Sequence, residues 1–380
     1  MNVAVPRETV PGERRVAATP DVVQRLVKSG CTVFVERGAG EAAGFLDSAY
    51  ESAGAAIAAD AGRCYGQANV VLKVQPPTAD EIALLPEGCT LIAFLQPLSN
   101  PQLARALARR RVSALAMELI PRISRAQSMD ALSSQATVAG YKAVLIAADL
   151  LPKFFPMLMT AAGTIPPAKV FVIGAGVAGL QAIATARRLG AVVSGFDVRP
   201  AVKEQVESLG ATFVSAETHA EAEGAGGYAK ELSEEQQQRE RDVIARAVAE
   251  SDVVITTALV PGKRAPLLIT RPMIEAMRPG SVVVDLAAEA GGNCEATVPG
   301  ETAVEGGVKI VGTLNLPSAM PQHASQLYAK NVYALFANFY KDGVLALDMN
   351  DEIARGVCVT RDGEIVNEAL RARAAAGGPA

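Results

Sequence analysis

Short apolar runs, each followed by an amphipathic or turn-rich stretch, recur along this chain. Runs rich in Val, Ile and Leu are typical of strands that are buried on both faces of a sheet. In the first third of the chain the runs are Asn2–Val5, Thr32–Glu36, Val70–Val74, Thr90–Phe94 and Ser113–Met117. Helical patterns begin between them, after a predicted cap at Thr19 followed by Pro20 and again near Thr78. Strands that alternate with helices predict a parallel sheet with helices on both faces.

A second series of apolar runs follows residue 168 with the same rhythm. The predicted strands are Val170–Ile173, Ala191–Phe196, Thr212–Val214, Val253–Thr256, Ser281–Asp285 and Lys309–Val311. The predicted helices of this half include 180–189, closed by Gly190, and the charged segment 234–251. Between the two series, Pro121–Tyr141 is polar and leads into a long helix through Leu151. We expect a cleft and a hinge at this polar segment.

Three glycines come directly after the strand 170–173, at Gly174, Gly176 and Gly179 in G-x-G-x-x-G spacing. Such a pattern is weak by itself, but here it lies between a strand and a helix, as a dinucleotide-binding turn requires. Gly174 would allow the tight turn, Gly176 a close approach of a pyrophosphate, and Gly179 close packing of the helix on the strand. The alternative is a turn of an α/β sheet that binds no nucleotide.

Asp197 ends the next predicted strand, which is where the acid that binds the adenosine ribose is found in such units. Its charge would repel a 2′-phosphate, so the sequence predicts NAD(H) rather than NADP(H). Arg199 weakens this preference, because a nearby Arg can receive that phosphate.

The fold class predicted from these patterns is α/β, with two Rossmann-like doubly wound parallel-sheet domains and a cleft between them. The first domain is expected to comprise residues 1–138 and 319–380, and the NAD(H)-binding domain residues 139–318. An apolar helical stripe from Leu327 to Phe339 is expected to return the chain to the first domain. Val357–Val366 is expected to form a hairpin that turns at Asp362 and Gly363.

Composition narrows the class of protein. The 380 residues are 50% hydrophobic and 20% charged with a formal net charge of −4, which does not favour a nucleic-acid binder. The five cysteines are scattered without a C-x-x-C pair, so we expect a reducing compartment and no metal site. We expect no signal peptide, because Arg7 interrupts the first residues, and no membrane span, because charges and prolines interrupt the most apolar stretch.

The polar segment is the strongest candidate for chemistry. Between 122 and 135 it gathers Arg, Gln, Ser and Asp side chains, and Arg122 and Asp130 are expected to pair. Gln127 offers a donor and an acceptor, as a carboxamide partner needs. The alternative, a hydrogen-bonded capping loop, is about as well supported by composition. The segment contains no histidine, and oxidation of an alcohol or amine needs a proton acceptor, whereas hydride transfer between two nicotinamide rings needs only alignment.

Other candidate ligand positions lie in turns that follow strands, at 257–262, 286–293 and 312–318. The segment 216–230 is small, acidic and glycine-rich and is expected either to close over a bound nucleotide or to be an insertion without a role. Arg15 and Lys73 are further candidates. Lys73 could equally be a lysine whose ammonium reaches solvent from the end of a strand.

At this point the chain resembles a known family over nearly its whole length. The segments that carry the resemblance are MELIPRISRAQSMDALSSQ, MTAAGTIPPAKVFVIGAGVAGLQAIATARRLGA, GGYAKE and ITTALVPGK through VVVDLAAEAGGNC. They are similar to the soluble NAD(H)-binding component of the proton-translocating nicotinamide nucleotide transhydrogenases. The absence of C-terminal membrane helices is similar to the split-subunit form.

The resemblance implies an oxidoreductase and translocase that exchanges hydride between NADH and NADP⁺ and is active only with its partners. NADP(H) would bind another component, membrane-embedded subunits would move protons, and this chain would form a homodimer in the cytoplasm, peripheral to the inner membrane. The catalytic residues implied are Arg122, Gln127, Asp130 and Ser133, with Gln127 touching the ring of NADP(H). The implied NAD(H) contacts are Arg122, Ile123, Ser124, Arg125, Gln127, Ser128, Met129, Asp130, Ser133, Gly174, Ala175, Gly176, Val177, Asp197, Val198, Arg199, Gly227, Tyr228, Ala258 and Leu259.

Alanine dehydrogenase is the nearest alternative, since it is similar in fold and shares Arg15 and Lys73. Its catalytic histidine is expected where this chain has Gln96, and Glu289 stands near the position of its catalytic aspartate. Both departures argue against amino-acid oxidation. A third possibility is a module that senses NAD(H) without catalysis.

Overall fold

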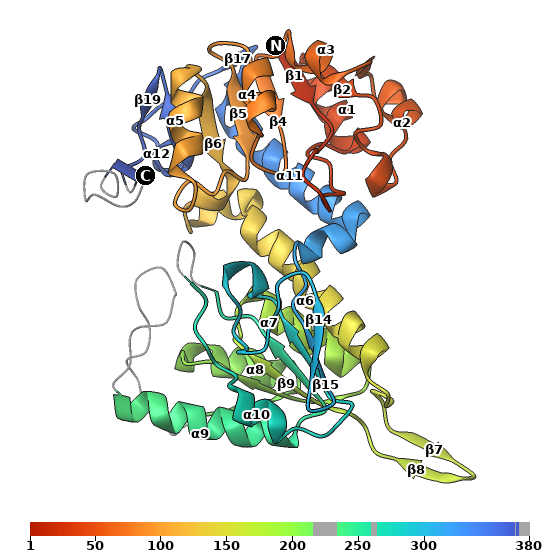
Figure 1. Ribbon diagram of the computed structural model, residues 1–380. Coiled ribbons are helices and arrows are strands. Elements are labelled where there is room, and N and C mark those ends of the chain that lie inside the picture. Colours follow the sequence, from red (N-terminus) through yellow and green to blue (C-terminus); the bar gives the residue numbers. More distant parts are fainter. Residues whose placement is uncertain (216–233, 260–263, 369, 372–380) are drawn as a thin grey trace. The chain divides into compact units, whose positions relative to one another are not determined.

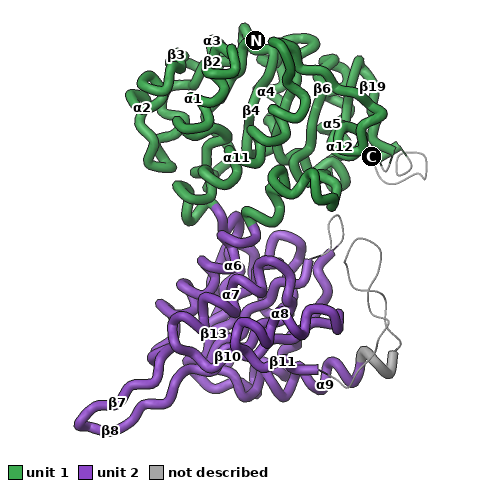
Figure 2. Tube along the Cα trace, turned by 180° about the vertical axis from the view of Figure 1, so that it is seen from behind, with its two compact units in different colours: residues 1–135, 318–380 green, residues 136–317 purple. Residues whose placement is uncertain are grey.

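The computed structural model describes residues 1–215, 234–259, 264–368 and 370–371. The chain divides into two compact units (Figure 2): unit 1 comprises Met1–Gln135 and Ser318–Ala380, and unit 2 comprises Ala136–Pro317. Unit 1 is therefore built from two separate segments of the sequence. The predicted cleft between domains concerns the relation of the two units and stays a prediction.

Unit 1 is organised around one sheet of order β19-β18-β6-β5-β4-β1-β2-β3 (Figure 1). The parallel strands are β1 Asn2–Val5, β2 Thr32–Glu36, β3 Ala56–Ala58, β4 Val70–Leu72, β5 Thr90–Ala93 and β6 Ser113–Ala116. Two antiparallel strands at one edge are β18 Cys358–Arg361 and β19 Glu364–Ile365. The predicted hairpin is thus confirmed, and positive φ angles at Asp362 (51°) and Gly363 (89°) explain why Asp-Gly stands at its turn.

The helices of unit 1 are α1 Pro20–Lys28, α2 Asp47–Ser52, α3 Ala61–Tyr65, α4 Ala79–Leu84, α5 Pro101–Arg109, α11 Pro321–Phe339 and α12 Glu352–Val357. Short 3-10 turns are η1 Glu41–Ala43, η2 Met117–Leu119 and η3 Ser124–Met129, and a small ribbon pairs β16 Tyr340–Lys341 with β17 Val344–Leu345. Thr78 and Glu81 form a complete capping box at α4. The cap predicted at Thr19 is wrong in its mechanism, because its hydroxyl donates to the Asp21 side chain and not to the backbone.

Unit 2 has a second sheet, of order β11-β10-β9-β12-β13-β15-β14. Its parallel strands are β9 Lys169–Ile173, β10 Val192–Phe196, β11 Thr212–Val214, β12 Val253–Thr256, β13 Val282–Asp285 and β15 Val308–Val311, and β14 Thr302–Glu305 is antiparallel. A separate hairpin joins β7 Leu158–Thr160 to β8 Gly163–Ile165. The sequence analysis missed β3, β14 and this hairpin, which are all short.

The helices of unit 2 are α7 Val177–Arg188, α8 Lys203–Ser208, α9 Glu234–Glu250 and α10 Arg271–Glu275, with 3-10 turns η4 Pro200–Val202 and η6 Ala288–Ala290. The helix α6, Ala131–Leu150, carries the chain from unit 1 into unit 2, and η7, Leu316–Ala319, carries it back. The helix predicted at 180–189 begins earlier than expected, at Val177, so its first turn follows the glycine motif directly.

Alternate residues of each central strand enter different hydrophobic clusters. In unit 2, Val170 and Val172 lie in one buried cluster, while Phe171 and Ile173 of the same strand lie in another. The same division separates Val3 and Val5 from Ala4 in unit 1. Because strands project successive side chains to opposite faces, both sheets are covered on both sides. The predicted fold class, α/β with parallel Rossmann-like sheets, is confirmed, with antiparallel strands added at the edges.

Candidate functional site

The glycine turn of unit 2 has the geometry of a phosphate cradle. Gly174 has φ of +98°, and a Cβ there would lie 2.5 Å from Oγ1 of Thr257. A Cβ at Gly179 would lie 1.8 Å from the Gly174 carbonyl oxygen, so the turn and the first turn of α7 are in direct contact. At Gly176 a Cβ would meet nothing within 4 Å. Gly174 and Gly179 are thus required by the fold, whereas Gly176 leaves open space beside the backbone.

The start of α7 is suited to an anion. Gly176 is the N-cap residue, and no side chain caps the helix. The first amides of an uncapped helix point outward, and the helix dipole adds a partial positive charge at that end. Ala175 and Val177, two of the predicted contacts, lie on either side of this cap. The residues present therefore fit a pyrophosphate at this turn.

Asp197 is joined to the same turn. Its Oδ2 accepts the amide of Ala175 at 2.7 Å, and its Oδ1 accepts the amide of Arg199 at 2.9 Å. The guanidinium of Arg199 also binds it, from Nε to Oδ1 at 2.8 Å and from NH2 to Oδ2 at 2.8 Å. The structure thus brings Asp197, Arg199 and the glycine turn together. The charge of Asp197 is paired, so it repels a 2′-phosphate less than an isolated carboxylate would.

A third charged residue, Glu240 of α9, lies close enough to interact with Asp197. Burial and, to a lesser extent, the negative charge of Asp197 raise the pKa of Glu240 to about 7. Sequence reasoning missed it, because it lies in a charged helix that reads as an ordinary surface helix. Glu240 therefore changes its charge near neutral pH beside the candidate ribose site.

The backbone after β12 is held by residues far along the chain. Ala258, a predicted nucleotide contact, donates its amide to Oδ1 of Asn293 at 3.1 Å, and its carbonyl accepts Nδ2 of Asn293 at 2.9 Å. The fully buried Asp285 in turn accepts the amide of Asn293 at 2.7 Å and the hydroxyl of Thr256 at 2.9 Å. Sequence reasoning named the turns 257–262 and 286–293 but not this connection between them. Leu259 is exposed, and the predicted contacts Gly227 and Tyr228 lie outside the described residues.

The polar segment of unit 1 forms the 3-10 turn η3 followed by α6. Asp130 accepts both the amide of Ser133 at 2.9 Å and its hydroxyl at 2.6 Å, which fixes the start of α6. Asp130 and Ser133 are thus brought together, as both interpretations of this segment require. Its exposed members are Arg122, Ser124, Arg125, Gln127 and Ser128, while Ile123 and Asp130 are partly buried and Met129 is buried. Gln127 therefore presents its amide to solvent.

Two contacts tie this turn to the C-terminal part of unit 1. Arg125 binds Asp351, the N-cap residue of α12, through two nitrogens at 2.7 and 3.0 Å. The hydrogen bond from Arg125 lowers the pKa of Asp351. Asn331 of α11 donates from Nδ2 to the carbonyl of Ser128 at 2.8 Å. Neither partner was predicted, because both lie some two hundred residues from the turn in sequence.

Arg15 and Lys73 lie in a buried cluster of charges in unit 1. Lys73 is fully buried and binds Glu81 at 2.8 Å and Glu8 at 3.1 Å, so the idea that its ammonium reaches solvent is wrong. Burial disfavours the charged form of Lys73, but the two carboxylates outweigh burial and raise its pKa. Glu13 binds Arg15, and although burial acts in the opposite direction, this pairing lowers the pKa of Glu13 to about 2.

Gln96, which stands where alanine dehydrogenases are expected to carry a catalytic histidine, has φ of +49°. The carboxylate of Glu118 accepts the amides of Leu95 and Gln96 and so fixes this turn. Burial raises the pKa of Glu118. The exposed amide side chain of Gln96 accepts no proton at neutral pH, so the turn offers no general base at that position.

Comparison with known proteins agrees with this geometry. The alanine dehydrogenase/PNT N-terminal domain matches residues 4–139, and the alanine dehydrogenase/PNT C-terminal domain matches residues 143–368. The first of the chains that form the NAD(P) transhydrogenase alpha subunit of Rhodospirillum rubrum is 52% identical over 384 residues, which cover 99% of this chain and 100% of that protein. The chain belongs to the NAD(P) transhydrogenase alpha-subunit family.

The transhydrogenase relationship extends to solved structures. A transhydrogenase from Sinorhizobium meliloti is similar with a TM-score of 0.88 and 47% identity, over 96% of this chain and 100% of that one. Alanine dehydrogenase of Bacillus subtilis is a more distant relative, 34% identical over 97% of this chain and 94% of that protein. Among the described residues, no helix is both long and apolar enough to cross a membrane.

Proposed function

We propose that this chain is the NAD(H)-binding component of a proton-translocating transhydrogenase. It would transfer hydride directly from NADH to NADP⁺ held by a partner subunit, while membrane-embedded subunits couple the transfer to proton movement. The observation that carries the proposal is the presence, in one chain, of a complete nucleotide turn in unit 2 and a polar turn in unit 1 that exposes Gln127. The family membership supports the role of a transhydrogenase component.

NAD(H) would supply the hydride, and the chain's own residues would hold and orient it. The amides at the start of α7 would bind the pyrophosphate, and Asp197 would accept the ribose hydroxyls. The nicotinamide would be held at the segment 122–133, where Asp130 and Ser133 fix the backbone and Gln127 offers both a donor and an acceptor. No step needs a general base, because hydride transfer between two pyridine rings releases no proton at the site.

The absence of a base also bears on the alternatives. The chain has two histidines, and neither lies in the segment 122–135 or in the turn at Gln96. Amino-acid oxidation releases a proton at the reacting carbon and so requires an acceptor there. A homodimer attached at the cytoplasmic side of the inner membrane through its partner subunits is the assembly that we propose.

The deciding experiment mixes the purified chain with an NADP(H)-binding transhydrogenase component and follows hydride exchange between NADPH and an NAD⁺ analogue with a shifted absorbance. Exchange that requires both proteins supports the proposal. Reduction of NAD⁺ that depends on alanine would instead indicate a dehydrogenase. Binding of NADH without either activity would indicate a sensor.

A further inference from the structure

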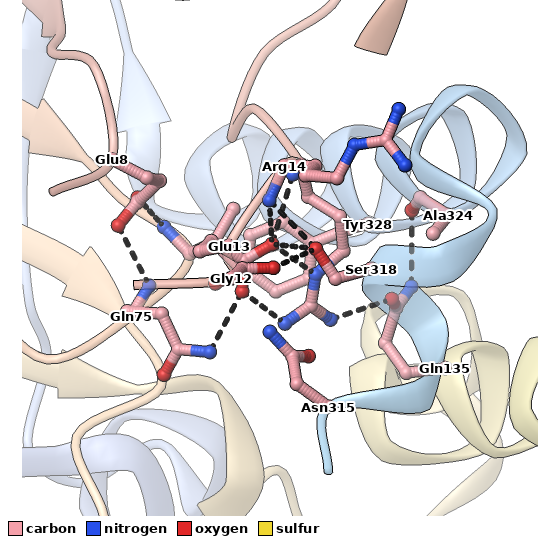
Figure 3. Close-up of polar contacts among 12 residues, drawn as sticks. Glu8, Gly12, Glu13, Arg14, Gln75, Gln135, Asn315, Ser318, Ala324 and Tyr328 are labelled. Atoms are coloured by element: carbon pink, nitrogen blue, oxygen red, sulfur yellow. Dashed lines mark hydrogen bonds and ion pairs between the residues drawn. The ribbon is translucent and has the colours of Figure 1, made fainter. Parts of the chain in front are cut away.

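A continuous series of hydrogen bonds in unit 1 joins the buried charges around Arg15 to the turn that carries Gln127. It begins at Glu13, whose side chain is fully buried and accepts Nε2 of Gln75 at 2.7 Å (Figure 3). Arg15 donates to Glu13 from Nε at 2.9 Å and from NH2 at 2.7 Å. The remaining nitrogen, NH1, donates to Oε1 of Gln135 at 2.8 Å. Arg15 is therefore engaged on both sides of its guanidinium.

The series continues through side chains that are each both donor and acceptor. Nε2 of Gln135 donates to the hydroxyl of Ser134 at 3.2 Å and to the carbonyl of Ala324 at 3.1 Å (Figure 3 shows the latter). The hydroxyl of Ser134 lies 2.7 Å from Oδ1 of Asn331. Nδ2 of Asn331 then reaches the carbonyl of Ser128, next to Gln127, at 2.8 Å. Four side chains thus connect Glu13 to the backbone of η3.

The direction of every bond in this series follows from Arg15. A guanidinium has donors and no acceptor, so the oxygen of Gln135 must face it. The amide nitrogen of Gln135 then faces Ser134, whose single hydroxyl proton is left for Asn331. The oxygen of Asn331 accepts that proton, and its nitrogen is left for the Ser128 carbonyl. Buried series of this kind are rigid when every member is satisfied.

The same contacts bear on a different role for Arg15, the binding of a substrate carboxylate. Glu13 already holds the guanidinium with two hydrogen bonds, and Lys73 already faces the carboxylates of Glu8 and Glu81. An incoming carboxylate would have to replace one of these buried pairs, which leaves a buried charge without a partner. The contacts therefore favour a role inside the protein.

We propose that Arg15 is a positioning residue that, through Gln135, Ser134 and Asn331, orients the hydrogen bond to the Ser128 carbonyl and so fixes the turn that presents Gln127. This inference deepens the proposed function, because the position of Gln127 matters only where a second nicotinamide must be aligned. It assigns to α11 a part in the site, although α11 supplies none of the predicted contacts.

The test uses two variants that break the series at defined links in the full chain. Gln135→Met keeps the length of the side chain and removes both of its hydrogen bonds. Asn331→Asp keeps the acceptor for Ser134 and loses the donor to Ser128. The matched control is Tyr50→Phe, which removes a buried hydrogen bond to the Ala18 carbonyl in the same unit, outside the series.

Amide hydrogen exchange of residues 124–130, measured without nucleotide or partner, is the first readout. We expect both series variants to raise the exchange rate about tenfold, as for a loss of roughly one buried hydrogen bond, and the control to leave it unchanged. Unchanged exchange in both series variants, or an equal rise in the control, would overturn the positioning role. If Gln135→Met fails to fold, the comparison of Asn331→Asp with the control decides.

The second readout is hydride exchange with the NADP(H)-binding partner. We expect the series variants to lower kcat about tenfold while the Kd for NADH changes less than about twofold, because the turn is misplaced and the nucleotide turn is intact. A parallel loss of rate and affinity would contradict positioning. If the unaltered chain gives no exchange with the partner, the proposed function fails, and amide exchange still decides whether the series fixes the turn.

Discussion

Asp197 accepts the guanidinium of Arg199 through both of its carboxylate oxygens, at 2.8 Å in each case. The carboxylate that is expected to bind the ribose is therefore neutralised by a residue two positions away on the same turn. Preference for NADH over NADPH then depends on the pair, since Asp197 opposes a 2′-phosphate and Arg199 can receive it.

Replacing Asp197 by Asn should weaken NADH binding about tenfold and narrow the preference for NADH over NADPH. The Asn side chain keeps the size but loses the charge and one acceptor. Titrations of both nucleotides, followed by their fluorescence, measure this. Asp252→Asn is the control, because Asp252 is a buried partner of Lys153 near the opposite end of β9. An unchanged preference in Asp197→Asn would remove the ribose assignment.

The three glycines of the nucleotide turn should respond differently to alanine. Gly179→Ala should lower the Tm strongly, because its Cβ would lie 1.8 Å from a backbone oxygen. Gly176→Ala meets no protein atom within 4 Å, so the chain should keep its Tm and lose NADH affinity by tenfold or more, as an order of magnitude. Thermal unfolding and NADH titration of both variants separate the two effects. Retention of full affinity in Gly176→Ala would argue against a pyrophosphate at this turn.

Gln127 is exposed, so its replacement should cost little stability. Gln127→Asn shortens the side chain by one methylene and moves its amide away from the incoming ring. We expect hydride transfer to slow by about tenfold or more and NADH affinity to change less than about twofold. Single-turnover transfer with the NADP(H)-binding partner, beside equilibrium binding, tests this, with the exposed Ser124→Ala as a neighbouring comparison. Equal losses in rate and affinity would contradict a positioning role.

Glu240 should make stability depend on pH. Its pKa is raised to about 7 in the folded chain from a usual value of 4.5, so between these pH values the folded state holds a proton that the unfolded state has released. Its contribution to stability is therefore lost as pH rises from about 4.5 to about 7 and is constant above that. The side chain is half-buried and partly screened by solvent, so we expect a change of roughly 1 kcal/mol.

The measurement is the Tm of the chain and of Glu240→Gln between pH 5 and pH 8. The variant should lose less stability than the natural chain over this interval, because Gln does not titrate. Identical pH profiles would show that Glu240 ionises with an ordinary pKa. Glu13, whose pKa is lowered to about 2, acts in the opposite sense, and its contribution is lost only as pH falls below about 4.5.

The features that the sequence predicted well are local. Gly174, Gly176 and Gly179 lie within one turn, and Asp197 ends the adjacent strand, so their spacing alone places them together. The strands were found because alternate residues face two buried clusters and leave near-continuous apolar runs. The early start of α7 was missed because Val177, Ala178 and Gly179 carry no helical pattern of their own.

The features that the sequence did not predict join distant segments. Asn293 holds Ala258 across 35 positions, and Asn331 holds Ser128 across 203. A single Asn in a loop or helix has no pattern that names its partner. The burial of Lys73 was also unpredictable from its strand, because it depends on Glu8 and Glu81 from two other segments.

Unit 1 is discontinuous, and Asn331 belongs to the segment that returns to it after all of unit 2. A ribosome therefore synthesises η3 long before the helix that anchors it. Nascent chains halted before residue 321 would hold a finished nucleotide turn in unit 2 but an unanchored segment around Gln127. The capacity to bind the dinucleotide is thus expected to arise during synthesis earlier than the capacity to react with a second one.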